Sequence, residues 1–158
     1  MNKKNKWLKR SVLLIIVILC SGLILLASYV LQYNKTLMTY QKSLANLPEV
    51  SEVLEIAEYS GQEQYYVAKV LLTSNKEYYY FIKNNTVDFS YPVEKLMTPE
   101  QAAQKALSLI GQGIVKHYYL GIYDEKPVYE VLVSLGDEEH YIIIDAKTGD
   151  VLLQFDIK

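Results

Sequence analysis

The most restrictive feature of the sequence is an uninterrupted apolar stretch, residues 11–31, which contains no charged residue and no proline. At about 1.5 Å per helical residue, it reaches roughly the 30 Å thickness of the hydrocarbon core of a bilayer. A cleaved secretory signal has a shorter apolar region and a clearer small-residue exit than Ala27-Ser28 provides. The stretch therefore predicts a transmembrane helix that is retained as a signal anchor.

The residues around this stretch predict its orientation. Residues 1–10 carry five basic side chains and no acidic one, a pattern that is typical of a cytoplasmic tail. Trp7 on one side and Tyr29 and Tyr33 on the other suit the two membrane interfaces. We therefore expect a single-pass protein of the cell membrane, with a cytoplasmic N-terminus and extracellular C-terminal domains.

Cys20 is the only cysteine, so the chain contains no internal disulfide and no thiolate metal cluster. Lipid attachment at Cys20 is disfavoured, because Leu19 replaces the small residue expected before a lipidated cysteine and a long apolar run follows. The simplest interpretation of Cys20 is a small apolar residue facing lipid.

The 127 residues after the anchor carry 11 basic and 18 acidic side chains, a formal net charge of −7. This charge argues against nucleic acid as a partner, because phosphate binding needs a basic surface. Fourteen of the fifteen tyrosines of the chain also lie in this part. The composition predicts a folded, tyrosine-rich exterior region.

The first half of this region predicts a helix and then strands. Residues 32–47 place apolar side chains at helical spacing and stop at Pro48, so the anchor is expected to continue as an amphipathic helix. Residues 64–73 and 77–83 are β-branched and aromatic and flank a short polar turn, which indicates a hairpin. Residues 50–59 are ambiguous, because their local periodicity favours a helix while their alternation permits a strand.

The second half begins with a strong helix signal. Thr98 as N-cap, Pro99 at the first helical position and Gln101 as the partner of a capping box predict a helix that ends at Gly111. Four strand candidates follow, at residues 114–122, 127–135, 140–145 and 151–155. Gly149 is placed for a left-handed turn position before the last of them.

The two halves resemble a repeat. Tyr66 and Tyr79 in the first half are spaced much as Tyr129 and Tyr141 are in the second, and each pair falls in a predicted hairpin preceded by a helix. By this analogy residues 50–59 correspond to residues 114–122, and we expect them to be a strand. The sequence predicts an α+β fold in which each half is a helix packed on a small antiparallel sheet.

The C-terminal half resembles a PepSY domain. The resemblance rests on the Thr98-Pro99-Glu100-Gln101-Ala102-Ala103 helix start, the strand core at residues 127–131, and the closing run from Asp145 through Thr148-Gly149 to Val151. With the basic tail, the single span and residues 59–67, the whole chain is similar to the TseB (YpmB) type of cell-wall elongation regulator. In that family a small cystatin-like domain precedes the PepSY domain, which implies domains at residues 32–92 and 93–158 after the tail at 1–10 and the anchor at 11–31.

The resemblance implies a non-catalytic extracellular protein that regulates peptidoglycan synthesis during Gram-positive cell-wall elongation by binding a class B penicillin-binding transpeptidase. PepSY domains are also linked to the inhibition of peptidases, so the alternative is a module that restrains a peptidase at the membrane surface. The family carries no catalytic residue over to this chain. Neither a cofactor nor a small-molecule substrate is expected.

The sequence contains no recognisable catalytic or metal-binding motif. His117 and His140 lack the spacing of a zinc site and have no cysteine partner. No nucleophile motif of the serine hydrolases or penicillin-binding enzymes is present. Asp145 and Asp150 flank a predicted turn and supply too few oxygens for calcium. We therefore expect no catalytic and no metal site.

The tyrosines are the best candidates for a functional surface. In residues 77–83 alternate side chains point to opposite faces of a strand, so one set must pack under a helix while the other is available to a partner. Alternatively, the two small domains pack face to face and bury both sets. The candidate partner-binding residues are Tyr65, Tyr66, Tyr78, Tyr79, Tyr80, Phe81, Tyr118 and Tyr119.

Overall fold

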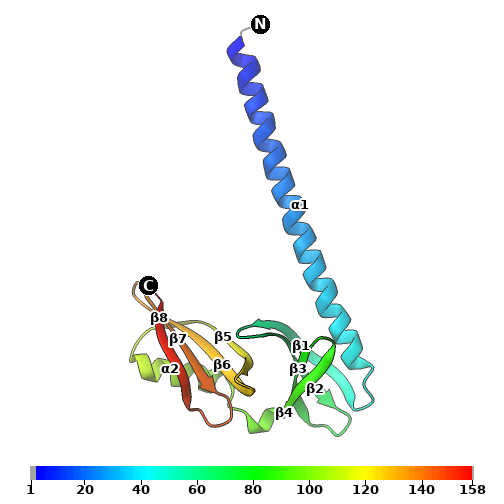
Figure 1. Cartoon of the computed structure of the whole chain (residues 1–158), viewed down its shortest axis with the longest axis vertical. Coiled ribbons are helices and arrows are strands. Elements are labelled where there is room, and N and C mark those ends of the chain that lie inside the picture. The colour runs from blue at the N-terminus through cyan, green and yellow to red at the C-terminus, as the bar shows by residue number, and fades with distance from the viewer. Residues whose placement is uncertain (1–2, 158) are drawn as a thin grey trace. The chain divides into compact units, whose positions relative to one another are not determined.

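The computed structural model describes the backbone of residues 3–157 and the side chains of residues 12–157. Its first element is a single continuous helix, α1 (Lys3–Ala45) (Figure 1). The predicted tail, with its basic residues and Trp7, lies outside the described side chains. From Val12 onward, α1 is long and apolar enough to cross a membrane, and its large apolar side chains between Val12 and Leu31 are exposed. This helix fits a single membrane anchor.

The first sheet is an antiparallel meander of four strands, β1 (Val50–Ser60), β2 (Gln64–Leu72), β3 (Glu77–Lys83) and β4 (Thr86–Pro92), in sequence order. The expectation that residues 50–59 form a strand is confirmed. β4 was not predicted, although Val87, Phe89 and Tyr91 alternate with polar residues. A two-residue turn at Asn84 and Asn85, both with positive φ, joins β3 to β4 and matches the twist of a hairpin.

The last turns of α1 cover one face of the first sheet. Leu44 is buried against Ala68, Val70 and Tyr80. Tyr40 packs beside this cluster, and its ring stacks on that of Tyr66 with centroids 4.2 Å apart. The amphipathic helix expected at residues 32–47 therefore exists, but it ends at Ala45. The prediction of a helix packed on a sheet is confirmed for this half.

The second half opens with a short 3₁₀ turn, η1 (Val93–Lys95), and the helix α2 (Pro99–Ile110). Both bonds of the predicted capping box are present: the Gln101 amide donates to the Thr98 hydroxyl, and the Thr98 amide donates to the Gln101 side chain. Gly111 ends the helix with a φ of 83°. The prediction of this helix is confirmed at both ends.

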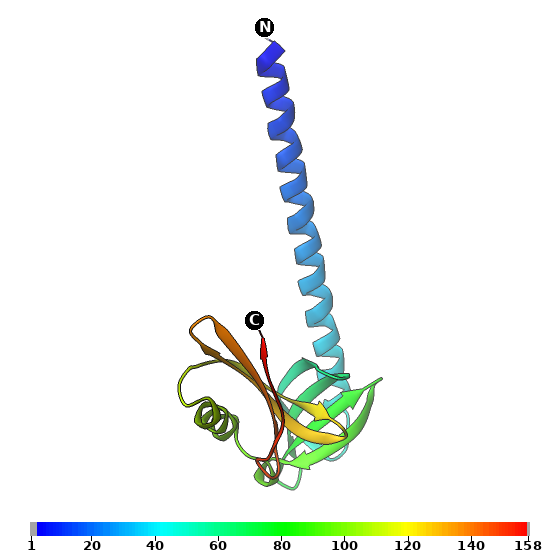
Figure 2. The same cartoon turned by 60° about the vertical axis from the view of Figure 1, so that its left-hand side comes forward.

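The second sheet repeats the topology of the first, with β5 (Ile114–Tyr123), β6 (Lys126–Leu135), β7 (Glu138–Asp145) and β8 (Val151–Ile157) in sequence order. α2 lies against one face of this sheet (Figure 2). Ala102 and Ala106 are fully buried there, because their small side chains let the helix approach the sheet closely. The core under α2 is built mainly from Tyr129, Val131, Val133, Ile142 and Ile144.

The opposite face of the second sheet has no helix on it. The strand register places Tyr119, Tyr141, Leu153, Phe155 and Ile157 on this side, and we call these five residues the open face. Four of them are substantially exposed, and Phe155 has an exposed fraction of 44%. Tyr141 and Phe155 pack against each other, with ring centroids 4.9 Å apart.

Candidate docking surface and interdomain cleft

The aromatic residues predicted as a platform on the first sheet are divided between its two faces. Tyr66, Tyr78 and Tyr80 pack in the cluster under α1, while Tyr65, Tyr79 and Phe81 pack toward the second sheet. Tyr65, Tyr80 and Phe81 are buried, and the other three are half-buried. No aromatic platform is therefore exposed on this sheet. The physical reason is that both of its faces are covered, one by α1 and the other by β5 residues such as Ile122.

Tyr118 and Tyr119 differ from the other candidates because they are exposed, with fractions of 42% and 50%. Both lie on β5, which pairs only with β6 and is therefore an edge strand of the second sheet. Their side chains point to opposite faces, as neighbours on a strand do. Tyr119 belongs to the open face, and its ring lies 4.9 Å from that of His117. A partner-binding role for these two tyrosines stays a prediction.

Tyr59 connects the two sheets. It stands near the end of β1, and its ring lies over Gly121 of β5, where an added Cβ would be 2.1 Å from the ring carbon Cζ. The Tyr59 hydroxyl donates a hydrogen bond to the carboxylate of Glu130 on β6. Only a glycine at position 121 leaves room for this ring. The sequence analysis missed this contact.

Glu130 is the polar centre of this contact. It is buried, and the Tyr141 hydroxyl donates a hydrogen bond to its second carboxylate oxygen. Burial raises the pKa of both tyrosines well above the usual range, and their bonds to Glu130 raise it further. Each hydroxyl therefore keeps its proton and continues to donate it to Glu130. Each oxygen of the buried Glu130 carboxylate therefore accepts a hydrogen bond, as buried polar groups in proteins usually do.

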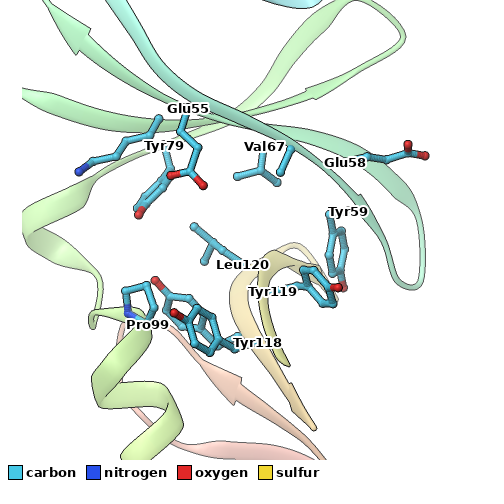
Figure 3. Close-up of a pocket in the computed structure, with 12 residues that line it drawn as sticks. Glu55, Glu58, Tyr59, Val67, Tyr79, Pro99, Tyr118, Tyr119 and Leu120 are labelled. Atoms are coloured by element: carbon cyan, nitrogen blue, oxygen red, sulfur yellow. The ribbon is translucent and has the colours of Figure 1, made fainter. Parts of the chain in front are cut away.

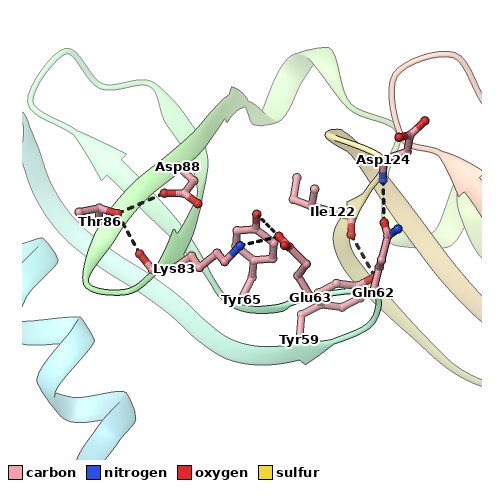
Figure 4. Close-up of polar contacts among 9 residues, drawn as sticks. All are labelled: Tyr59, Gln62, Glu63, Tyr65, Lys83, Thr86, Asp88, Ile122 and Asp124. Carbon is pink, nitrogen blue, oxygen red and sulfur yellow. Dashed lines mark hydrogen bonds and ion pairs between the residues drawn. The ribbon is translucent and has the colours of Figure 1, made fainter.

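A second group of polar contacts lies at the turn between β1 and β2 (Figure 4). The Asp124 amide donates to the Gln62 side chain at 3.2 Å, which joins this turn to the turn between β5 and β6. Glu63 accepts from Lys83 at 2.7 Å and from the Tyr65 hydroxyl at 3.1 Å. The Lys83 bond, followed by the Tyr65 bond, lowers the pKa of Glu63, while burial raises that of Tyr65 to about 12.

A cleft of about 140 Å³ lies between β1 of the first sheet and β5 of the second, beside the start of α2 (Figure 3). Its walls are largely aromatic. The residues that matter for its chemistry are Glu55, Lys69, Tyr79, Tyr118, Tyr119 and Tyr129. Its volume is below the roughly 300 Å³ at which pockets for drug-sized ligands begin. The cleft can hold one long side chain.

The Tyr129 hydroxyl is the most unusual polar group of this cleft. Tyr129 is 1% exposed, and its hydroxyl has no hydrogen-bond partner of standard geometry among the described residues. Burial, followed by the charge interaction with Tyr79, raises the pKa of Tyr129 above its usual range. The Tyr79 hydroxyl interacts with that of Tyr129 as a weak hydrogen-bond neighbour, which leaves the Tyr129 oxygen able to accept a further hydrogen bond from a ligand in the cleft.

The two carboxylates that line the cleft point in different directions. In Figure 3 the Glu55 carboxylate points into the space between the strands, whereas that of Glu58 points away from it. Glu58 also accepts a hydrogen bond from Gln64. A pair of catalytic carboxylates would face each other across the substrate. Among the described residues, no group of three histidine, cysteine, aspartate or glutamate side chains could hold a metal ion.

The remaining sequence candidates have structural roles. His140 is buried, and its Nδ1 lies 2.7 Å from the Asp156 carboxylate. Asp145 accepts hydrogen bonds from the amides of Lys147 and Thr148, which closes the turn between β7 and β8. Gly149 has the left-handed φ of 76° that this turn was expected to need.

Comparisons with known proteins agree with this architecture. Residues 96–155 match the family model of the PepSY domain, which is described as "Peptidase propeptide and YPEB domain". The structure is similar to that of the YpmB protein from Bacillus subtilis, with a TM-score of 0.61 and 18% identity over 69% of this chain and 88% of that one.

A weaker likeness links the chain to a protein of Clostridium difficile 630 that is described as a candidate lipoprotein. The TM-score is 0.40 and the identity 22%, over 66% of this chain and 82% of that one. No curated protein matches the sequence. The expected PepSY domain and the expected YpmB type of architecture are confirmed.

Proposed function

Because the chain carries a PepSY domain in residues 96–155, behind a helix that fits a membrane anchor, we propose that it is a non-catalytic regulator of peptidoglycan synthesis. It acts outside the cell, with its basic tail in the cytoplasm, and binds a class B penicillin-binding transpeptidase of the cell-wall elongation machinery. The observation that carries this proposal is the two-sheet fold that the chain shares with YpmB over most of its length.

The open face of the second sheet supports a docking role. It presents Tyr119, Leu153, Phe155 and Ile157, each at least 38% exposed, on the side that α2 leaves uncovered. Tyrosine and phenylalanine are enriched in protein interfaces because their flat rings bury a large area at a small entropic cost. A sheet face of this kind suits a protein partner better than a small molecule.

The absence of a paired-carboxylate site supports a non-catalytic role. In the described part of the chain, Glu55 and Glu58 are the two acids at the cleft, and they diverge. The buried Glu130 is already held by two tyrosine hydroxyls, so it has no free position opposite a substrate. The polar groups of this molecule therefore serve its architecture and its binding surfaces.

Restraint of a membrane-surface peptidase is the second candidate, and the wording of the family description, "Peptidase propeptide", favours it. A restraining module would need a segment that enters the active site of the peptidase. In residues 50–157 the irregular segments between helices and strands are short, and residues 146–150 are among the longest. Docking through a sheet face therefore ranks first.

Photo-crosslinking in living cells tests the proposal. A benzoylphenylalanine is placed at Tyr119 or Phe155 of the full chain, and a matched control is placed at Leu109, an exposed apolar residue of α2. We expect adducts with one class B transpeptidase at the first two positions and none at Leu109. Adducts with a protease would favour the second candidate. Equal adducts at all three positions, or none, would overturn docking through the open face.

A further inference from the structure

The cleft between β1 and β5 is lined by groups that favour one chemical class of occupant. Glu55 places a carboxylate in it, while the only cation on its walls, Lys69, is paired with Glu77 at 2.8 Å. The Glu77 bond raises the pKa of Lys69, so that ion pair persists. Glu55 is the cross-strand neighbour of Lys69 and also raises its pKa, so this one cation faces two carboxylates and the net charge at the cleft is negative.

The aromatic walls favour the same occupant. Tyr79, Tyr118 and Tyr119 surround the space into which Glu55 points (Figure 3). A guanidinium or ammonium group within about 6 Å of such a ring is attracted to its face. The Tyr129 hydroxyl, which makes no hydrogen bond of standard geometry within the described residues, adds an oxygen that can accept a hydrogen bond from that group. A cationic side chain would satisfy the carboxylate, the rings and the hydroxyl together.

The surroundings of the cleft indicate that this side chain belongs to an extended segment. β1 and β5 are both edge strands, and each pairs with only one neighbour in the described part of the chain. An edge strand can pair with a further strand, as in recognition by strand addition, although the Ile122 carbonyl of β5 already accepts from the Tyr59 hydroxyl. Tyr119 lies on the open face and also lines the cleft, so a partner that crosses that face reaches the cleft there.

We infer that the cleft between β1 and β5 binds an arginine or lysine side chain from an extended segment of the partner protein. Glu55 pairs with its charge, the tyrosine rings enclose its stem, and the Tyr129 hydroxyl accepts a hydrogen bond from its head group. This inference rests on the proposed function, since it names the recognition element by which the exterior region holds its partner.

Peptide binding to the full chain in phosphatidylcholine nanodiscs tests the inference without any transpeptidase. The probe is a fluorescein-labelled Ser-Val-Thr-Arg-Thr-Val-Ser peptide, measured by anisotropy against empty nanodiscs. The matched peptide carries glutamine in place of arginine. We expect the arginine peptide to bind about tenfold more tightly, because an ion pair and a cation–π contact together reach that size.

Variants of the chain locate the site. Glu55→Gln should remove most of the preference for arginine, and Tyr129→Phe should weaken the binding of the arginine peptide about threefold. Glu52→Gln, the same change on β1 but outside the cleft, should leave the preference intact. Equal binding of the two peptides, or equal effects of Glu55→Gln and Glu52→Gln, would overturn the inference.

The two proposals can fail separately. Crosslinks to a transpeptidase from Phe155 without any arginine preference would retain the proposed function and reject the cleft as its recognition element. A preference for arginine that depends on Glu55, in a chain that forms no transpeptidase adduct, would retain the cleft and reject that partner.

Discussion

The two sheets have the same strand order and each has a helix on one face, but they differ in what covers the other face. The first sheet is closed on both sides, by the end of α1 and by residues of β5 such as Ile122. On the open face of the second sheet, the first sheet places the ring of Tyr59 over Gly121 and Glu130, while four residues of that face are exposed. The same topology is therefore covered on both faces in one half and leaves apolar side chains exposed on one face in the other.

The largest expected effect contrasts a phenylalanine from each sheet. Phe81→Ala removes a fully buried ring between the sheets and should cost ~3–5 kcal/mol of unfolding free energy. Phe155→Ala on the open face should cost ~1 kcal/mol or less, because the ring is already half in solvent. Urea unfolding of the full chain in detergent micelles measures both. Similar costs for the two variants would mean that the open face is covered.

A smaller effect is expected where the two sheets join. Gly121→Ala forces a Cβ into the Tyr59 ring and should cost ~1–3 kcal/mol through overpacking. In a Tyr59→Ala background the same glycine change should cost almost nothing, because its obstacle is gone. The free energy of unfolding is measured for the wild type, the two single variants and the double variant. Additive effects of the two substitutions would contradict the contact.

A third substitution should destabilise α2 without affecting the first sheet. Thr98→Ala removes one bond of the capping box at the start of α2 and should cost ~1 kcal/mol. Amide hydrogen exchange should then accelerate in α2 while the amides of β2 and β3 keep their protection. An equal acceleration in both sheets would mean that the two halves unfold as one unit.

The smallest effect concerns alkaline pH. The pKa of Tyr59 is higher in the folded chain than in the unfolded one, where it is about 10, so its contribution is intact below pH 10 and is lost as the pH rises above that value. Between pH 8 and 10.5 the wild type should lose ~0.8 kcal/mol more than Tyr59→Phe. Unfolding free energies at the two pH values test this, and parallel losses would contradict it.

Most of the fold could be predicted because its signals are local. The capping residues Thr98 and Gln101 define the start of α2, and β-branched and aromatic runs define β2, β3 and β6. β1 is the informative exception, since its local periodicity favours a helix and only the repeat indicated a strand. Pairing with β2 decides its structure, and that pairing is a tertiary effect.

The site could be predicted only in part, because exposure depends on packing between distant segments. The run at residues 77–83 correctly separates into two faces, but nothing in it shows that both faces are covered. Tyr59 and Glu130 are 71 residues apart, and no spacing rule connects them. Likewise, Glu55 is one of several regularly spaced glutamates in the sequence. Its position in the cleft depends on how β1 and β5 meet in the folded chain.

The order of the strands also has a consequence for how the chain acquires its structure. Within each sheet, neighbouring strands are consecutive in sequence, so each sheet closes through short loops and needs no strand from the other half. We therefore expect each meander to form quickly. The bond from Tyr59 to Glu130 spans both halves and must form last, so the docking of the two halves is the expected slow step in maturation.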